Sequence, residues 1–114
     1  MAGIITISDE KRWEVSNWAY WNLMDHVLGL LITASHAARF VETCKWMQGL
    51  DISLMQQDEP ELAGPVLLAL KRAAQSCSEG SVPAKVDDRV LDEEAQRQFR
   101  EATNQLFTML SGLP

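Results

Sequence analysis

Residue types that build disulfide frameworks, metal sites and phosphate loops are scarce in this chain of 114 residues, which has two cysteines, two histidines and six glycines. Cys44 and Cys77 lie far apart and form no CxxC motif. This spacing favours two buried thiols, with a single bridge between them as the alternative. The glycines are isolated from one another, which excludes a loop that cradles phosphate through clustered backbone amides.

Long apolar runs are also lacking. Near the N-terminus the apolar stretch is limited to Ile4, Ile5 and Ile7, whereas a secretory signal needs about 7–15 apolar residues. The densest apolar run, residues 27–32, is far shorter than the roughly 20 residues that span a bilayer. We therefore expect a cytoplasmic protein with no membrane association.

Basic charge is in deficit, with ten Lys and Arg against sixteen Asp and Glu and a formal net charge of −6. Because nucleic-acid binding normally requires a basic face, we expect no direct contact with nucleic acid.

Apolar residues recur mostly at intervals of three and four, which is typical of helices. Only Ile4-Ile5-Thr6-Ile7 has β-branched character, and one short strand cannot make a sheet. The pattern predicts an all-α fold, a compact antiparallel bundle of about four helices in one domain over residues 1–114. We expect the helices near 8–24, 25–48, 60–78 and 88–111.

Several residues mark where these helices begin, end and pack. A break is expected at Ser16-Asn17 or between Asn22 and Gly29, because an unbroken helix up to residue 48 would be too long for a domain of this size. Gly49 is a natural helix end, and residues 50–64 are expected to form a connection in which Asp58 is a candidate cap and Pro60 a candidate first helical residue. Four residues of the last helix are predicted to face the core: Leu91, Phe99, Leu106 and Leu110.

Catalytic patterns are missing. His26 and His36 are ten residues apart, so on one helix they would point about 80° away from each other and could not share a metal ion. The adjacent pairs Asp25-His26 and Ser35-His36 do not face one another on a helix. There is no nucleophile elbow and no cysteine in a protease context. We therefore expect no enzyme activity, no cofactor and no metal.

Aromatic residues are concentrated near the N-terminus, where Trp13, Trp18, Tyr20 and Trp21 fall within nine residues. We expect most of these rings in the core and one or two at the surface. Trp18 and Trp21, three residues apart on a predicted helix, are the candidate binding residues, because tryptophan is enriched in binding hot spots. Asn17 and Asn22 flank them and are candidates for hydrogen bonds to a partner.

Acidic residues are concentrated before and within the start of the last predicted helix. Five acids are opposed only by Arg89 and are candidate partner-binding residues: Asp87, Asp88, Asp92, Glu93 and Glu94. Favourable interaction with the helix dipole explains one or two of them. The excess predicts attraction of a basic partner, with a merely solvated helix start as the alternative.

These features favour a small acidic binding protein that inhibits or neutralises a specific protein partner with a basic surface. An immunity protein, an antitoxin and a phage-type inhibitor of an enzyme all fit this description. The alternative is a self-associating assembly subunit, such as a homodimer, because the segment from Trp13 to Met47 is too apolar for a small monomer to cover. A carrier or enzyme lined by Trp21, Met24, His26 and Met47 is a third hypothesis.

Overall fold

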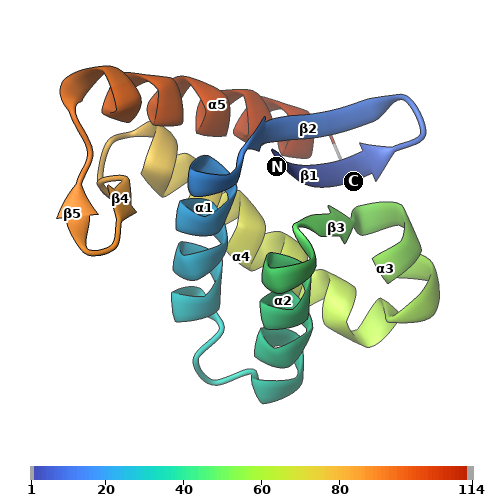
Figure 1. The fold of residues 1–114 in the computed structure, drawn as a ribbon. Helices are drawn as coiled ribbons and strands as arrows, with labels where there is room; N and C mark the ends of the chain where they lie inside the picture. The colour runs from blue at the N-terminus through green and yellow to red at the C-terminus, as the bar shows by residue number, and fades with distance from the viewer. Residues whose placement is uncertain (1, 113–114) are drawn as a thin grey trace.

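The computed structural model describes residues 2–112. Within this range the chain forms five helices and two small sheets, so the predicted all-α bundle of about four helices is wrong. The elements are, in order, β1 (Ala2–Ser8), β2 (Lys11–Ser16), α1 (Asn17–Leu30), α2 (Ser35–Met47), β3 (Gly49–Asp51), α3 (Ile52–Asp58), α4 (Pro60–Ser78), β4 (Lys85–Val86), β5 (Arg89–Val90) and α5 (Glu93–Ser111). In Figure 1 the sheet formed by β1, β2 and β3 and the β4–β5 hairpin lie at opposite ends of the molecule.

The larger sheet has the strand order β2-β1-β3, with β2 antiparallel and β3 parallel to β1. The β-branched run at residues 4–7 does form a strand, and it finds two partners that the sequence analysis missed. One partner, β2, alternates buried Trp13 and half-buried Val15 with exposed polar residues. This period of two fits a half-buried strand, and Ile5 pairs with Trp13 across the ladder.

Burial fixes this sheet to the helices. Ile5, Ile7 and Trp13 are almost fully buried, and the Trp13 indole nitrogen donates a 2.8 Å hydrogen bond to the carbonyl of Ala102 in α5. A Cβ atom on Gly3 would lie 2.1 Å from Cγ of buried Tyr20. Glycine therefore allows β1 to approach α1 closely.

The first two predicted helices, 8–24 and 25–48, are wrong in their bounds. Residues 8–16 belong mostly to the β1–β2 hairpin, and α1 begins at Asn17, where one of the expected breaks lay. The alternative break between Asn22 and Gly29 is wrong, because those residues lie inside α1, and residues 31–34 separate α1 from α2. The end of α2 agrees with the prediction, because Gln48 adopts a left-handed conformation (φ 59°) immediately before Gly49.

The next segment contains one helix that was not expected and one that was. The predicted connection holds α3, whose N-cap is Asp51, with the carboxylate accepting a 3.0 Å hydrogen bond from the Leu54 amide. Asp58 ends α3 and does not cap α4. The predicted helix 60–78 is confirmed in α4, with Pro60 in its first turn and Pro65 after that turn.

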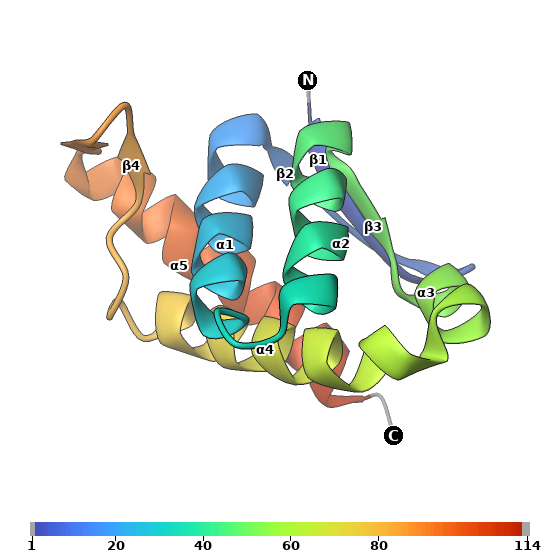
Figure 2. The ribbon, with the colours of Figure 1, turned by 90° about the horizontal axis from the view of Figure 1, so that it is seen from below.

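The last helix is shorter than predicted, because β5 and the residues after it take the place of its first turn. Phe99, Leu106 and Leu110 are buried as predicted, whereas Leu91 is half-buried and precedes α5. Helix α4 packs along α5, and its buried residues include several alanines, among them Ala69. Figure 2 shows α1 and α2 side by side, with α4 crossing them and α5 beyond it.

Candidate functional site

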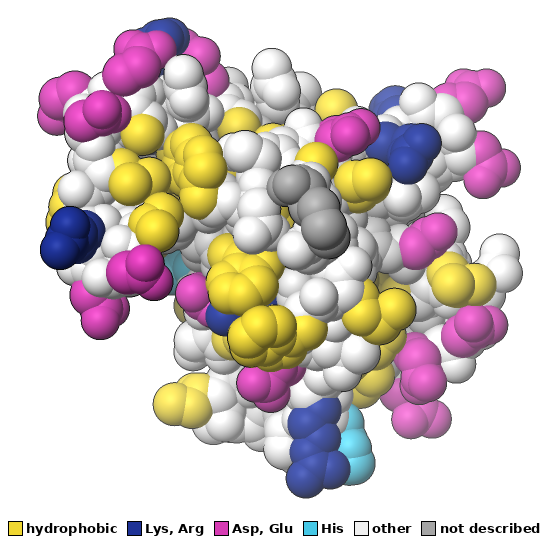
Figure 3. Space-filling model, viewed as in Figure 1, with side chains coloured by type: hydrophobic (Ala, Val, Ile, Leu, Met, Phe, Trp, Pro, Cys, Tyr) yellow, Lys and Arg dark blue, Asp and Glu magenta, His cyan; other side chains and the backbone are white. Residues whose placement is uncertain are grey.

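The tryptophans divide between the core and the surface. Trp13 and Tyr20 are buried, whereas Trp18 and Trp21 are half-buried and Trp46 is 63% exposed. Trp18 packs against Phe99 of α5, with ring centroids 6.2 Å apart. Trp21 contacts Trp46 edge-on, with ring centroids 4.9 Å apart. In Figure 3, hydrophobic side chains gather over α1 and the end of α2, with Asp and Glu side chains around them.

The β4–β5 hairpin is fastened to the helices by two amide side chains. Asn22 of α1 accepts a hydrogen bond from the Lys85 amide and donates one to the Lys85 carbonyl, both at 2.8 Å. Gln96 of α5 pairs in the same way with the amide and carbonyl of Ala84, at 2.8 and 2.9 Å. Asn22 therefore binds the protein's own hairpin, and the hypothesis that its amide contacts a partner has no support in this geometry.

Asp87 and Asp88 form the turn of this hairpin. Their φ angles are 50° and 64°, and Val86 pairs with Arg89 on either side of them. Two consecutive positive φ angles define a type I′ turn, in which aspartate is tolerated less well than asparagine or glycine. Both residues are exposed, and neither forms an ion pair with any residue in the range 2–112.

The structure brings the tryptophans and this acidic turn together. Trp18, Trp21 and Asp25 of α1 lie with Asp87 around a hollow of about 290 Å³. The remaining residues that line it are Asn17, Asn22, Lys85 and Val86. We call this hollow the Trp–hairpin pocket. A second, more open hollow of about 580 Å³ adjoins it and includes His26 and Asp88.

A cation already lies against the aromatic side chains at this site. The Lys45 ammonium is 4.7 Å from the ring centroid of Trp21 and 5.7 Å from that of Trp46. It also forms a 2.6 Å ion pair with Asp25. An indole face attracts cations through its quadrupole. The cluster of Trp21, Trp46 and Asp25 around Lys45 therefore has the electrostatics and the shape to hold a positive charge.

The other predicted acids lie at the start of α5 and are used differently. The Asp92 carboxylate caps the helix by accepting a 2.9 Å hydrogen bond from the Ala95 amide. Glu94 is bonded to Arg97, whose hydrogen bond and charge lower the pKa of the Glu94 carboxyl. Glu93 is exposed and has no ion pair among the described residues. Of the five predicted acids, Asp87, Asp88 and Glu93 therefore have neither an ion pair among the described residues nor a capping role.

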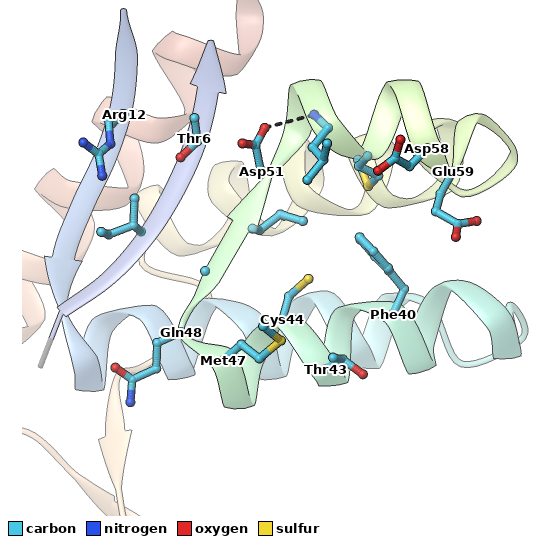
Figure 4. Close-up of a pocket in the computed structure, with 15 residues that line it drawn as sticks. Thr6, Arg12, Phe40, Thr43, Cys44, Met47, Gln48, Asp51, Asp58 and Glu59 are labelled. Carbon is cyan, nitrogen blue, oxygen red and sulfur yellow. Dashed lines mark hydrogen bonds between the residues drawn. The ribbon is translucent and has the colours of Figure 1, made fainter. Parts of the chain in front are cut away.

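A third hollow of about 510 Å³, which we call the sheet groove, has no counterpart among the sites expected from the sequence. Its floor includes Ile4, which is on the face of β1 opposite the buried Ile5, and Phe40 and Met47 of α2 form a wall. Figure 4 shows Arg12 at one end and Asp58 at the other, so its charges are separated. The only sequence signal for this groove is the alternation in β1.

The four residues of the carrier hypothesis do not line one cavity. Met24 is fully buried, Met47 lines the sheet groove, Trp21 lines the Trp–hairpin pocket, and His26 lines the adjoining hollow. Over residues 2–112, no group of three or more His, Cys, Asp or Glu side chains is arranged to hold a metal ion.

Both thiols are free and buried. Burial raises the pKa of Cys44 to about 11 and that of Cys77 to about 12. Thiolate is the nucleophilic form, so these residues are poor nucleophiles near neutral pH. Burial, together with nearby Cys44, also raises the pKa of Tyr20, whose hydroxyl donates a 2.7 Å hydrogen bond to the Cys44 carbonyl.

Comparisons with protein-family models, curated proteins and solved structures gave no match. None of the helices in the described part of the chain combines the length and apolar character needed to cross a bilayer.

Proposed function

We propose that this protein binds a specific protein partner with a basic surface and thereby inhibits or neutralises it, as an immunity protein, an antitoxin or a phage-type enzyme inhibitor does. The observation that carries the proposal is the Trp–hairpin pocket, where Trp18 and Trp21 lie beside Asp87 although α1 and the hairpin are far apart in sequence.

The two residue types at this face have complementary roles in association. Exposed carboxylates steer a basic partner toward the face and increase the association rate. Half-buried tryptophans then provide anchors that slow dissociation. Val86 and Val90, 42% and 61% exposed, add apolar area beside the acidic turn.

Binding rather than catalysis is supported by the state of the reactive groups. The two thiols are buried with raised pKa values, and His26 and His36 come from different helices. Free thiols are typical of reducing compartments, which supports our proposal of a cytoplasmic location. We also propose that the protein does not bind nucleic acid or a membrane directly.

The test compares three matched proteins in capture from the cell of origin, followed by binding kinetics with the purified partner. In the first variant, Asp87→Asn, Asp88→Asn and Glu93→Gln remove three charges. Asparagine tolerates the positive φ angles of the turn at positions 87 and 88. We expect association at low salt to slow about tenfold or more, and the difference to shrink as the Debye length falls from about 10 Å at 0.1 M to about 3 Å at 1 M.

The control variant carries Asp9→Asn, Glu10→Gln and Asp58→Asn, which remove the same charge from exposed positions away from the pocket. It should bind like the wild type. Unchanged rate and affinity for the first variant at low salt would contradict the proposal.

Self-association through the edge of β2 is a second candidate function. Ile4 donates its amide hydrogen to Gln48, on the β3 side of β1. Because backbone groups alternate along a strand and Ile4 lies opposite Glu14, the groups of Arg12 and Glu14 point away from β1, toward the open edge of β2.

This edge is complementary to itself. If two copies paired antiparallel about Trp13, Arg12 of each would lie opposite Glu14 of the other, and opposite charges across a ladder are stabilising. The solution mass tests this hypothesis: Arg12→Glu should give monomers, and the double variant Arg12→Glu with Glu14→Arg should restore dimers. A monomeric wild type at high concentration would contradict it.

A further inference from the structure

The Trp–hairpin pocket combines aromatic walls with carboxylates. Trp18 and Trp21 contribute the indoles, and Asp25 and Asp87 contribute the acids, around about 290 Å³ of space. This volume exceeds that of one long side chain and is too small for most folded elements. The size therefore suits a single side chain projecting from a partner.

The cluster already holds one cation by the same chemistry. Lys45 lies over Trp21 and Trp46 and pairs with Asp25. Asp87 has no such partner among residues 2–112. Lys85 also lines the pocket, but it forms no ion pair with Asp87. The pocket thus offers indole surface and an Asp87 carboxylate that no cation of the described residues pairs with.

Polar atoms in the pocket residues are also unsatisfied. The side-chain oxygen of Asn17 and the indole nitrogen of Trp21 are buried, and neither has a hydrogen-bond partner within the described range. Buried polar atoms without partners are uncommon and are often completed by a bound group or by water. The oxygen of Asn17 is an acceptor, which matches a ligand rich in N–H donors. The Trp21 indole nitrogen is itself a donor, so a guanidinium would leave it to water, and only the Asn17 oxygen supports the inference.

We infer that the Trp–hairpin pocket receives the guanidinium group of an arginine side chain of the protein partner, an inference that rests on the proposed function. A guanidinium is planar and stacks on indole rings, and it is more weakly hydrated than an ammonium group. Its five N–H donors exceed the three of lysine, and Asn17 and Asp87 both provide oxygen acceptors.

The experiment titrates ¹⁵N-labelled protein with acetyl-arginine amide and follows the indole N–H signals by NMR. The neutral acetyl-citrulline amide has nearly the same shape, and acetyl-lysine amide has the same charge. We expect saturable shifts of the Trp18 and Trp21 signals with arginine, with about tenfold weaker binding of citrulline. The Trp13 signal should stay unmoved, because that indole is bonded to Ala102 in the core.

A matched pair of variants locates the site. Asp87→Asn should weaken arginine binding severalfold, whereas Asp9→Asn, the same change in the turn of the other hairpin, should leave it unchanged. Equal affinity for the citrulline amide, equal affinity for the lysine amide, or no effect of Asp87→Asn would each overturn the arginine assignment.

Failure of this inference is distinguishable from failure of the proposed function. If a partner is captured through the acidic turn while arginine amide leaves the indole signals unmoved, the arginine assignment is overturned and the proposed function stands. If arginine amide binds but neutralising the turn changes no partner association, the proposed function is overturned, and with it the claim that a partner supplies the arginine.

Discussion

The protein contains two hairpins that are held in place by different physical means. The β1–β2 hairpin buries Ile5, Ile7 and Trp13 and forms part of the hydrophobic core. Every residue of β4 and β5 is exposed, and the amides of Asn22 and Gln96 hold the base of that hairpin. A two-stranded ribbon is at best marginally stable by itself. Hydrogen bonds therefore allow the short hairpin to keep its charged turn and its valines available at the surface.

Removing the buried anchor of the long hairpin should have the largest effect. Trp13→Ala deletes a ring that is 2% exposed and removes the indole N–H that the Ala102 carbonyl accepts in addition to its helical bond. We expect the free energy of unfolding to fall by about 3–5 kcal/mol in chemical denaturation. The same substitution at exposed Trp46 should cost much less. A loss below about 1 kcal/mol at Trp13 would show that this hairpin is not part of the core.

The close approach of β1 to α1 should be the next most sensitive feature. In Gly3→Ala the new Cβ would overlap the ring of Tyr20, which is buried and hydrogen-bonded. Overpacking of this kind typically costs about 1–3 kcal/mol. Gly64→Ala provides the contrast, because nothing lies within 4 Å of its Cβ position in α4. It should stabilise the protein by up to about 1 kcal/mol, and thermal unfolding that moves both variants in the same direction would contradict this account.

The short hairpin should instead respond to loss of a tether. Gln96→Ala removes both side-chain hydrogen bonds to buried Ala84, whose carbonyl still accepts from the Leu91 amide. The Ala84 amide is left unpaired, and an unpaired buried backbone group costs about 1–3 kcal/mol. We expect faster hydrogen exchange of the Ala84 amide. The control is Gln98→Ala, which removes only a 3.4 Å contact with Glu94. Equal exchange rates in the two variants would show that Gln96 does not hold the hairpin.

The smallest effect is expected in the turn itself. Asp88→Gly relieves the positive φ angle at this position, although glycine also gains freedom in the unfolded chain. We expect a net stabilisation below about 1 kcal/mol by thermal unfolding. Asp88→Val should destabilise, because a β-branched residue is strongly disfavoured at positive φ. If Asp88→Val leaves the thermal stability unchanged, the backbone at this position is not strained.

The same contrast explains how far the sequence predicts the fold. The helix at Pro60–Ser78 was predicted with its bounds because its apolar period and its prolines are local signals. The long hairpin is not predicted, because Trp13 also fits a helical spacing and the alternation of β2 covers only two apolar residues. Its alternation over Trp13 and Val15, after the Asp9-Glu10 turn, is the signal that would have identified it.

For the candidate site, the sequence predicts the parts but not their assembly. Trp18, Trp21 and Asp87 were each identified by residue type and local density. Their convergence depends on Asn22 bonding Lys85 across 63 residues, and no local pattern contains that contact. Asp92 and Glu94 show the converse, since neighbouring groups in α5 already engage both carboxylates.

Hydrogen–deuterium exchange of this protein with and without its captured partner tests the central claim most directly. The account predicts slower exchange on binding in residues 17–25 and 84–90, which carry the Trp–hairpin pocket, and unchanged exchange in residues 2–16. Protection confined to the β1–β2 hairpin or to the α2 and α3 walls of the sheet groove would contradict it.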